Sequence, residues 1–269
     1  MVWKSWGSDK LVEFIDTHCH LNLENFKNDL DQVIDRALEK GVTTFIVPGY
    51  DLETSRAAVT LADKYPRIFA AVGIHPNSAF EWDQDALHEI RILSNHPKVA
   101  AIGEIGLDYY RDHATPQQQL EALLPQLELA VLQQLPVILH SRKAEQHLLE
   151  LVLSVNHPAL QGVFHAFEGS LEQAATLVRH GFLIGAGGQI TYKKNELHRQ
   201  LFAAIPLSAI ILETDAPFLS PQVLRGTRNE PANIPLIAEL AASLQNVPIQ
   251  EFAYQTTRNA QNVFQRISI

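Results

Sequence analysis

The chain has 269 residues, 46% of them hydrophobic, and a formal net charge of −9. This length fits one large α/β domain or two small ones, and the apolar content supplies a full hydrophobic core. The negative charge argues against a broad basic surface for long duplex DNA but leaves room for local capture of phosphate. No apolar stretch reaches the roughly 18 residues that span a bilayer, and residues 1–10 lack the apolar region of a signal peptide. We therefore expect a soluble, cytoplasmic protein with no membrane contact.

The chain contains one cysteine, Cys19. A single thiol excludes an intramolecular disulfide and a structural zinc site built from several thiolates. Any metal ion must therefore be held by nitrogen and oxygen ligands.

Short apolar runs alternate with segments whose apolar residues recur at helical spacing. The first strand is expected at 11–15, and the helix after it at 25–40, where Gly41 follows as a C-cap. The other strands are expected at 42–47, 67–73, 99–104, 136–140, 162–166, 182–185 and 209–214. The helices between them are expected at 52–64, 84–95, 116–134, 144–154, 171–180 and 195–204, and two more within 231–267.

Eight strand–helix units in one series favour a closed (β/α)8 barrel, the TIM barrel, over an open doubly wound sheet. An open sheet would usually carry a glycine-rich phosphate loop after its first strand, whereas this chain has Asp16-Thr17-His18-Cys19-His20 there. No linker divides the chain, so residues 11–269 are predicted to form a single domain. Residues 1–10 are predicted to be an irregular N-terminal extension, whose Trp3 and Trp6 either pack on the outside of the barrel or stay disordered.

The segment after the first strand holds two histidines separated by one residue. Because side chains alternate between the faces of a strand, Asp16, His18 and His20 are expected on one face. Thr17 and Cys19 are expected on the other face, toward the helices. Two imidazoles on one face can close on a metal ion, although such a pair by itself is often an accident of composition.

Residues of metal-binding type also end most of the other predicted strands. In a parallel barrel these ends emerge on one rim, where active sites are built. Four imidazoles with two carboxylates are too many ligands for one tetrahedral ion and suit two ions that share a carboxylate. Five histidines lie at these ends, His18, His20, His75, His140 and His165, and four of them with Glu104 and Asp215 would make up the site.

In this order, the strand ends resemble those of the TatD-related metal-dependent hydrolases, a branch of the amidohydrolase-like barrels. The resemblance extends over nearly the whole chain. It rests on Asp16-Thr17-His18-Cys19-His20, Gly73-Ile74-His75-Pro76, Gly103-Glu104-Ile105-Gly106-Leu107-Asp108, Pro136-Val137-Ile138-Leu139-His140-Ser141-Arg142, Gly187-Gly188 and Glu213-Thr214-Asp215-Ala216-Pro217.

The resemblance implies two metal ions held by these residues. His18 and His20 would hold the first ion, and His140 and His165 the second, with Glu104 as the bridge between them. Histidine-rich sites favour zinc, manganese or nickel by ligand softness, whereas the family's nucleases suggest magnesium. The identity of the two divalent ions therefore stays open.

Three of these residues would also have catalytic roles. Asp215 would bind the first ion and take up a proton, and Glu104 would hold the ions together. His75 would lie close to the ions and help to hold a phosphate. The expected reaction is attack of a metal-bridged hydroxide on a phosphodiester.

Residues beside the ligands are expected to support them. Asp16 and Asp108 would orient a histidine or anchor a loop, and for Asp108 a turn or helix cap is an equal alternative. Glu213 is expected to point away from Asp215, or to face the helices with a partner such as an arginine, and has no catalytic role. The family commonly has a small hydroxyl where this chain has Glu168, which would disfavour an anionic substrate if it points inward.

Basic and aromatic residues in the rim loops are candidates for substrate binding. Arg142, Tyr192, Arg225 and Arg228 could receive phosphates and stack a base. The pair Lys193-Lys194 fits this role too, but a solvated helix start explains it better.

The leading hypothesis is a metal-dependent phosphodiesterase, and the resemblance suggests a deoxyribonuclease that acts from DNA ends. The negative charge favours a short single strand or a small phosphodiester over long duplex DNA as the substrate. An alternative is an amidohydrolase-type enzyme that cleaves a small amide, ester or lactone. A barrel that only binds metal or a partner is disfavoured because every ligand type is present. The oligomeric state and the physiological pathway are not predicted.

Overall fold

The computed structural model describes residues 12–267, in which eight parallel strands follow one another around a single sheet. This confirms the predicted (β/α)8 barrel. The strands are β1 (Phe14–Asp16), β2 (Val42–Pro48), β3 (Ile68–Val72), β4 (Val99–Asp108), β5 (Val137–Arg142), β6 (Gly162–His165), β7 (Leu183–Ala186) and β8 (Ile210–Leu212). Residues 1–11, with Trp3 and Trp6, lie outside the described residues.

The barrel closes between β8 and β1 through backbone hydrogen bonds. The Thr17 N–H donates to the Leu212 carbonyl over 3.0 Å, and the Asp215 N–H donates to the His18 carbonyl over 2.8 Å. Cys19 and Ala216 form a parallel bridge just beyond. This seam brings the first and last ligand-bearing segments side by side.

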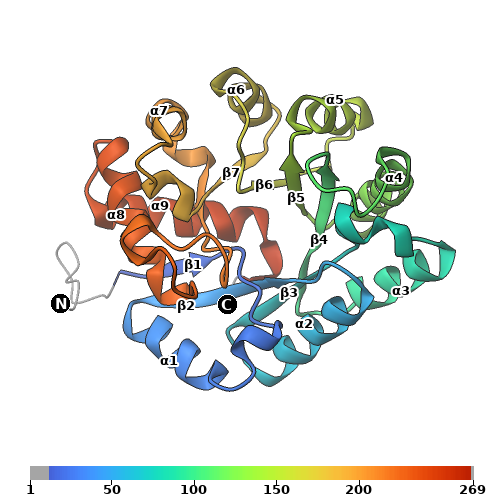
Figure 1. Cartoon of the computed structure of the whole chain (residues 1–269), viewed down its shortest axis with the longest axis horizontal. Helices are drawn as coiled ribbons and strands as arrows, with labels where there is room; N and C mark the ends of the chain where they lie inside the picture. The colour runs from blue at the N-terminus through green and yellow to red at the C-terminus, as the bar shows by residue number, and fades with distance from the viewer. Residues whose placement is uncertain (1–11, 268–269) are drawn as a thin grey trace.

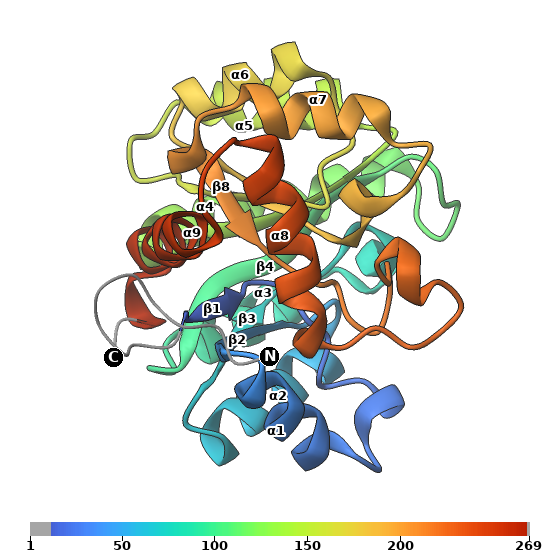
Figure 2. The ribbon, with the colours of Figure 1, turned by 90° about the vertical axis from the view of Figure 1, so that its left-hand side faces the viewer.

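The helices surround the strands in chain order (Figure 1). Figure 2 shows the loops after β4 and β8 projecting on the same side, as the carboxyl ends of parallel strands must. The helices are α1 (Leu30–Glu39), α2 (Leu52–Lys64), α3 (Gln84–Ser94), α4 (Pro116–Gln133), α5 (Glu145–Val155), α6 (Leu171–Arg179), α7 (Glu196–Ala204), α8 (Ile234–Leu244) and α9 (Ile249–Val263). None of these helices is long and apolar enough to cross a membrane.

Two apolar layers hold the barrel together. In β2, Phe45 and Val47 pack in the large cluster between strands and helices, whereas Ile46 belongs to a smaller cluster inside the barrel. This alternation explains why the strands are apolar throughout their length. The inner cluster also contains Val263 and Phe264 from the end of α9. These apolar side chains fill one end of the barrel, and the polar site lies at the other end.

The predicted boundaries differ from the observed ones by more than two residues at three places. The first strand begins at Phe14 and not at residue 11, and β4 continues to Asp108 because it pairs with β5 as far as Arg142. The predicted helix at 25–40 is a short 3-10 turn, Glu24–Phe26, followed by α1. Asp29 separates the two because its backbone, at φ −142° and ψ 23°, is not helical.

Candidate metal centre

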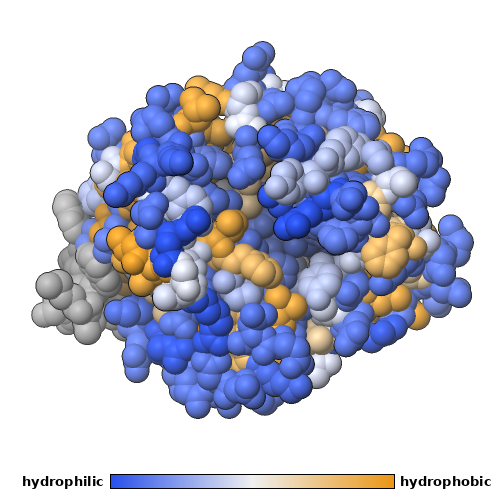
Figure 3. Space-filling model, viewed as in Figure 1, coloured by the Kyte–Doolittle hydropathy of each residue, from blue (hydrophilic) through white to orange (hydrophobic). Residues whose placement is uncertain are grey.

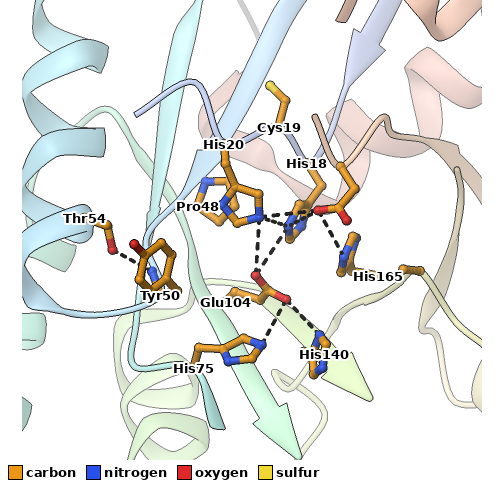
Figure 4. A network of polar contacts seen from close by, with 12 residues as sticks. His18, Cys19, His20, Pro48, Tyr50, Thr54, His75, Glu104, His140 and His165 are labelled. Atoms are coloured by element: carbon orange, nitrogen blue, oxygen red, sulfur yellow. Dashed lines mark hydrogen bonds and ion pairs between the residues drawn. The ribbon is translucent and has the colours of Figure 1, made fainter. Parts of the chain in front are cut away.

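The predicted ligands converge at the mouth of the barrel. Figure 4 shows His18, His20, His75 and His140 turned toward Glu104 of β4, while Cys19 points away from them. Cys19 is fully buried in the outer apolar cluster, as alternation along the chain predicts. The strand ends thus bring together residues that are up to about two hundred positions apart in the chain.

Four ligand atoms form a compact group at the end of β1. His18 Nε2 lies 3.2 Å from His20 Nε2, 3.4 Å from Glu104 Oε2 and 3.6 Å from Asp215 Oδ1. His20 Nε2 lies 3.7 Å from the same Glu104 oxygen and 3.4 Å from the same Asp215 oxygen. A tetrahedral ion with bonds of about 2.0–2.1 Å separates its ligands by roughly 3.3 Å, so these spacings match one cation at the centre.

The second oxygen of Glu104 faces a different pair of imidazoles. Glu104 Oε1 lies 3.0 Å from His140 Nδ1 and 3.6 Å from His75 Nε2. Each carboxylate oxygen therefore belongs to a separate group, which is the arrangement that a bridge between two ions requires.

The close approach of the Nε2 atoms supports a metal over a network of hydrogen bonds. The Nε2 atoms of His18 and His20 lie 3.2 Å apart, and oxygens of Glu104 and Asp215 lie within 3.7 Å of both. A cation at the centre would satisfy both nitrogen lone pairs and both carboxylates at once. The residues present therefore fit a divalent ion held by imidazole nitrogen and carboxylate oxygen.

His75 is suited to donate a hydrogen bond and not to bind a metal. Its Nδ1 accepts the Asn77 backbone N–H over 3.0 Å, so the ring proton must be on Nε2, which faces Glu104. Burial lowers the pKa of His75 to about 3, which keeps the ring neutral near pH 7. The Nε2–H of His75 is therefore a hydrogen-bond donor that faces Glu104 at the site.

His140 lies between two carboxylates. Its Nδ1 faces Glu104, and its Nε2 lies 3.3 Å from Asp108 Oδ2. Burial opposes a charge on the ring, but the contacts with Asp108 and Glu104 outweigh it and raise the pKa of His140 to about 9. Asp108 also accepts the backbone N–H groups of Tyr110 and Arg111, so it both orients a histidine and caps a turn. The two alternatives for Asp108 are both realised.

The predicted orientation of Glu213 is wrong. Glu213 is buried and its Oε1 lies 3.0 Å from His165 Nδ1, with no arginine partner among residues 12–267. Asp215 Oδ1 lies 3.7 Å from the other nitrogen of the same ring, so both carboxylates point toward His165. Burial opposes a charge on His165, but the charges of Glu213 and Asp215 raise its pKa to about 10.

The structure groups His165 with His18 and Glu213, and His140 with His75 and Glu104. The His165 ring stacks on the His18 ring with centroids 3.5 Å apart. The pairing of His140 with His165 around a second ion therefore stays a prediction.

Asp16 is tied to β8 and not to an imidazole. Its Oδ1 accepts the Thr214 N–H over 3.0 Å and its Oδ2 accepts the Thr214 hydroxyl over 2.5 Å. Burial raises the pKa of this carboxyl to about 7, against the opposing effect of the Thr214 hydrogen bonds. Asp16 thus anchors the segment that carries Asp215, as one of its two predicted roles requires.

Two buried glutamines of α4 fix the ends of β3 and β4, and the sequence analysis did not find them. Gln126 accepts the Ile74 N–H and donates to the Ile74 carbonyl. Gln119 bonds the N–H and the carbonyl of Asp108 in the same way. The signal in the sequence is two glutamines seven residues apart on one helix face. They position the segments that carry His75 and Asp108.

We predict that Gln126→Ala lowers the free energy of unfolding by about 2–3 kcal/mol, because the Ile74 N–H loses its acceptor in a buried place. Gln117→Ala, at an exposed position of the same helix, should change it by less than about 0.5 kcal/mol. Urea denaturation of the metal-free proteins measures both. Equal stability of the two variants would contradict the anchoring role.

The rim carries two arginines that stack on tyrosines. The Arg142 guanidinium lies 3.8 Å from the ring centre of Tyr110, and that of Arg225 lies 4.5 Å from the ring centre of Tyr192. Among residues 12–267, neither guanidinium has a carboxylate oxygen within 4.0 Å. Tyr110, whose ring is mostly exposed, is a rim residue that the sequence analysis did not single out.

Arg228 must be removed from the predicted substrate-binding set. Its guanidinium binds both oxygens of Asp29 over 2.8 and 2.6 Å and lies over the Phe26 ring. These contacts tie the loop after β8 to the start of α1. Glu168, the departure from the family pattern, is exposed.

The site opens toward solvent on one side only. The His18 side chain is fully buried, whereas those of His140, Asp215 and His75 are 19%, 12% and 11% exposed. Figure 3 shows this face of the molecule with a hollow near its centre and hydrophobic residues beside it. Phe218, about half exposed, packs edge-on to His20. A substrate can therefore reach the carboxylate and imidazole groups from the rim.

A family model described as TatD related DNase matches residues 15–265. The chain belongs to the TatD-related DNase family. Among relatives, YabD of Bacillus subtilis, named an uncharacterized metal-dependent hydrolase, is 37% identical over 93% of this chain and 98% of its own length. TatD of Salmonella typhimurium, named a 3'-5' ssDNA/RNA exonuclease, is 34% identical over 93% of this chain and 98% of its own length.

The barrel also matches a solved TatD homologue. The crystal structure of YjjV from Escherichia coli superimposes with a TM-score of 0.90 at 34% identity, covering 94% of this chain and 98% of that one. An organophosphorus hydrolase of Deinococcus radiodurans matches with a TM-score of 0.64 at 14% identity, which shows a shared fold alone. The resemblance inferred from the strand ends is thus confirmed for the TatD family.

Proposed function

We propose that this TatD-family protein is a metal-dependent deoxyribonuclease that cleaves DNA from its ends. The observation that carries the proposal is Glu104, whose two oxygens face two separate groups of imidazoles at the open end of the barrel. A relative that is 34% identical over nearly its whole length is named an exonuclease on single-stranded DNA and RNA, which supports the same activity here.

We propose that the site holds two divalent ions, of zinc, manganese, nickel or magnesium. His18, His20 and Asp215 would hold the first, and His140 and His165 the second, with Glu104 between them. When bound, such ions lower the pKa of a water molecule and stabilise negative charge on phosphoryl oxygens.

The protein's own groups would orient the phosphate and move the proton. Asp215 is the carboxylate that combines ligand contacts with exposure to the mouth, so it can take a proton from the attacking water. The Nε2–H of His75 can donate to a non-bridging oxygen, since its Nδ1 already accepts the Asn77 N–H. Both groups line the exposed side of the site, where the scissile bond must lie.

The two arginine–tyrosine pairs would hold the strand beside the scissile phosphate. Arg142 follows His140 by two residues on β5, which places the Arg142–Tyr110 pair beside the second group. The Arg225–Tyr192 pair joins the loop after β7 to the loop after β8, which begins with the segment that carries Asp215. Unpaired guanidinium groups bind phosphate, and aromatic rings stack bases without sequence preference. These local contacts would let a protein with a net charge of −9 bind a short single strand.

The test is an assay of the metal-reconstituted protein on end-labelled single- and double-stranded DNA, beside small phosphodiesters and lactones. We expect release of nucleotides from the ends of the single strand and no lactone hydrolysis. His140→Ala should abolish the activity, which excludes a contaminant. Cleavage of lactones or esters without any cleavage of DNA would instead establish the amidohydrolase-type alternative.

We predict that Arg142→Ala and Arg225→Ala each raise the KM for a short single strand about tenfold or more, because each removes a charge-assisted contact to phosphate. Arg228→Ala should leave the KM within about twofold, since Asp29 already binds that guanidinium. Initial rates on a labelled oligonucleotide measure all three. An equal rise for Arg228→Ala would contradict the assignment.

A further inference from the structure

We propose that Glu213 is a positioning residue that sets the orientation and the tautomer of His165 for metal binding. The proposal rests on the proposed function, because it takes His165 as a metal ligand. Glu213 is not one of the proposed metal ligands.

The contacts of Glu213 place its carboxylate directly behind the His165 ring. Oε1 lies 3.0 Å from His165 Nδ1 and accepts the backbone N–H of Ala166 over 2.8 Å. Ala166 adopts a left-handed backbone conformation with φ 44°, which is unusual for a residue with a side chain. This turn brings the Ala166 N–H to the same oxygen that faces the imidazole.

The neighbouring strand leaves room for this carboxylate. A Cβ atom at Gly185 would lie 2.3 Å from Glu213 Oε2, and one at Gly187 would lie 3.5 Å from Glu213 Oε1. Only the absence of a side chain at Gly185 lets the carboxylate occupy this place. Gly185 of β7 therefore leaves the space that the Glu213 carboxylate, after β8, occupies.

Glu213 is a buried carboxylate with a single ionic contact. It is 1% exposed, and His165 is its only ion-pair partner among residues 12–267. Its Oε2 has no hydrogen-bond partner in the same range. A buried carboxylate needs a positive charge nearby, which protonated His165 supplies without metal and a metal ion on Nε2 of His165 would supply when bound.

His165 is held so that its other nitrogen faces the site. Nε2 lies 3.7 Å from Asp215 Oδ1, and the ring is stacked on that of His18 at an interplanar angle of 10°. The 3.0 Å contact with Nδ1 does not have hydrogen-bond geometry, but the negative charge of Glu213 favours a proton on that nitrogen and so leaves the Nε2 lone pair for a metal. His140 has the converse arrangement, with Nε2 at Asp108 and Nδ1 facing Glu104, so each of the two histidines has a carboxylate at the nitrogen that faces away from the site.

The test compares Glu213→Gln with Glu172→Gln, the same change at an exposed position of α6. Metal content after dialysis and competition with a chromophoric chelator give the affinity for Zn²⁺, and thermal melting of the metal-free proteins gives the folding control. We expect Glu213→Gln to bind one of two ions about 10–100-fold more weakly, as loss of such a partner usually does. Unchanged affinity for both ions would overturn the proposal.

Gly185→Ala provides a second variant that keeps Glu213. Its new methyl group should displace the carboxylate and weaken the same ion. Loss of metal in both variants supports the proposal, whereas full metal binding by Gly185→Ala contradicts it, even if Glu213→Gln fails to fold. The proposed function fails separately if the wild-type protein binds no Zn²⁺ at all or cleaves no phosphodiester when loaded.

Discussion

Glu104→Gln is expected to lower the turnover of DNA by about a hundredfold to a thousandfold and to reduce the bound metal from two ions to one. The reason is that an amide offers one oxygen and an NH2 group, so it cannot present an acceptor to both groups of imidazoles. Loss of a group that stabilises charge in the transition state commonly costs 10²–10³ in rate.

Metal analysis after dialysis and initial rates on an end-labelled single strand measure this prediction. Glu172→Gln makes the same change of charge at an exposed position and should behave like the wild-type protein. A Glu104→Gln variant that keeps two ions and near-normal turnover would show that the carboxylate does not bridge them.

Asp215→Asn is expected to separate metal binding from proton transfer. The Asn oxygen can still contact an ion beside His18 and His20, so metal should remain bound when it is supplied in excess. The amide cannot accept a proton, however, and turnover should fall by about 10²–10⁴, the usual contribution of a general base.

The measurement is turnover at saturating metal together with the metal content of the same sample. Asp215 is 12% exposed on its side chain, so the substitution should leave the fold intact, and circular dichroism checks this. Near-normal turnover with metal fully bound would rule out the proton-transfer role.

The sequence was sufficient to predict the barrel and the convergence of the strand ends. Eight apolar runs separated by helical segments indicated eight parallel strands, and parallel strands in a closed barrel must end on one rim. This explains why the sequence alone predicts that His18 and Asp215, about two hundred residues apart, lie close together. Their contacts across the seam between β1 and β8 agree with that placement.

Side chains whose role depends on a residue elsewhere in the chain were harder to predict. Gln119 and Gln126 look like ordinary polar residues of a helix, since nothing local shows that their amides face the ends of β3 and β4. Arg228 looked free because its partner Asp29 lies far away in the chain. Such pairings depend on which loops the fold brings into contact.

The orientation of Glu213 and the tautomer of His75 depend on the local backbone, which the sequence does not show. β8 ends at Leu212 and Asp215 has a left-handed backbone with φ 58°, so strand alternation could not predict that Glu213 and Asp215 both contact His165. The proton on His75 depended on the Asn77 backbone N–H, which only the turn after β3 brings to Nδ1. The tautomer of a histidine is therefore set by its second hydrogen bond, which is a tertiary property.

The most direct test of the two-ion nuclease is a metal titration. Chelator-treated protein is titrated with Zn²⁺ or Mn²⁺ while release of nucleotides from an end-labelled single strand is followed. The proposal predicts no release without metal, a rise that levels off at two equivalents, and no release from His140→Ala at any metal concentration. Release that is complete at one equivalent, or that proceeds without metal, would contradict it.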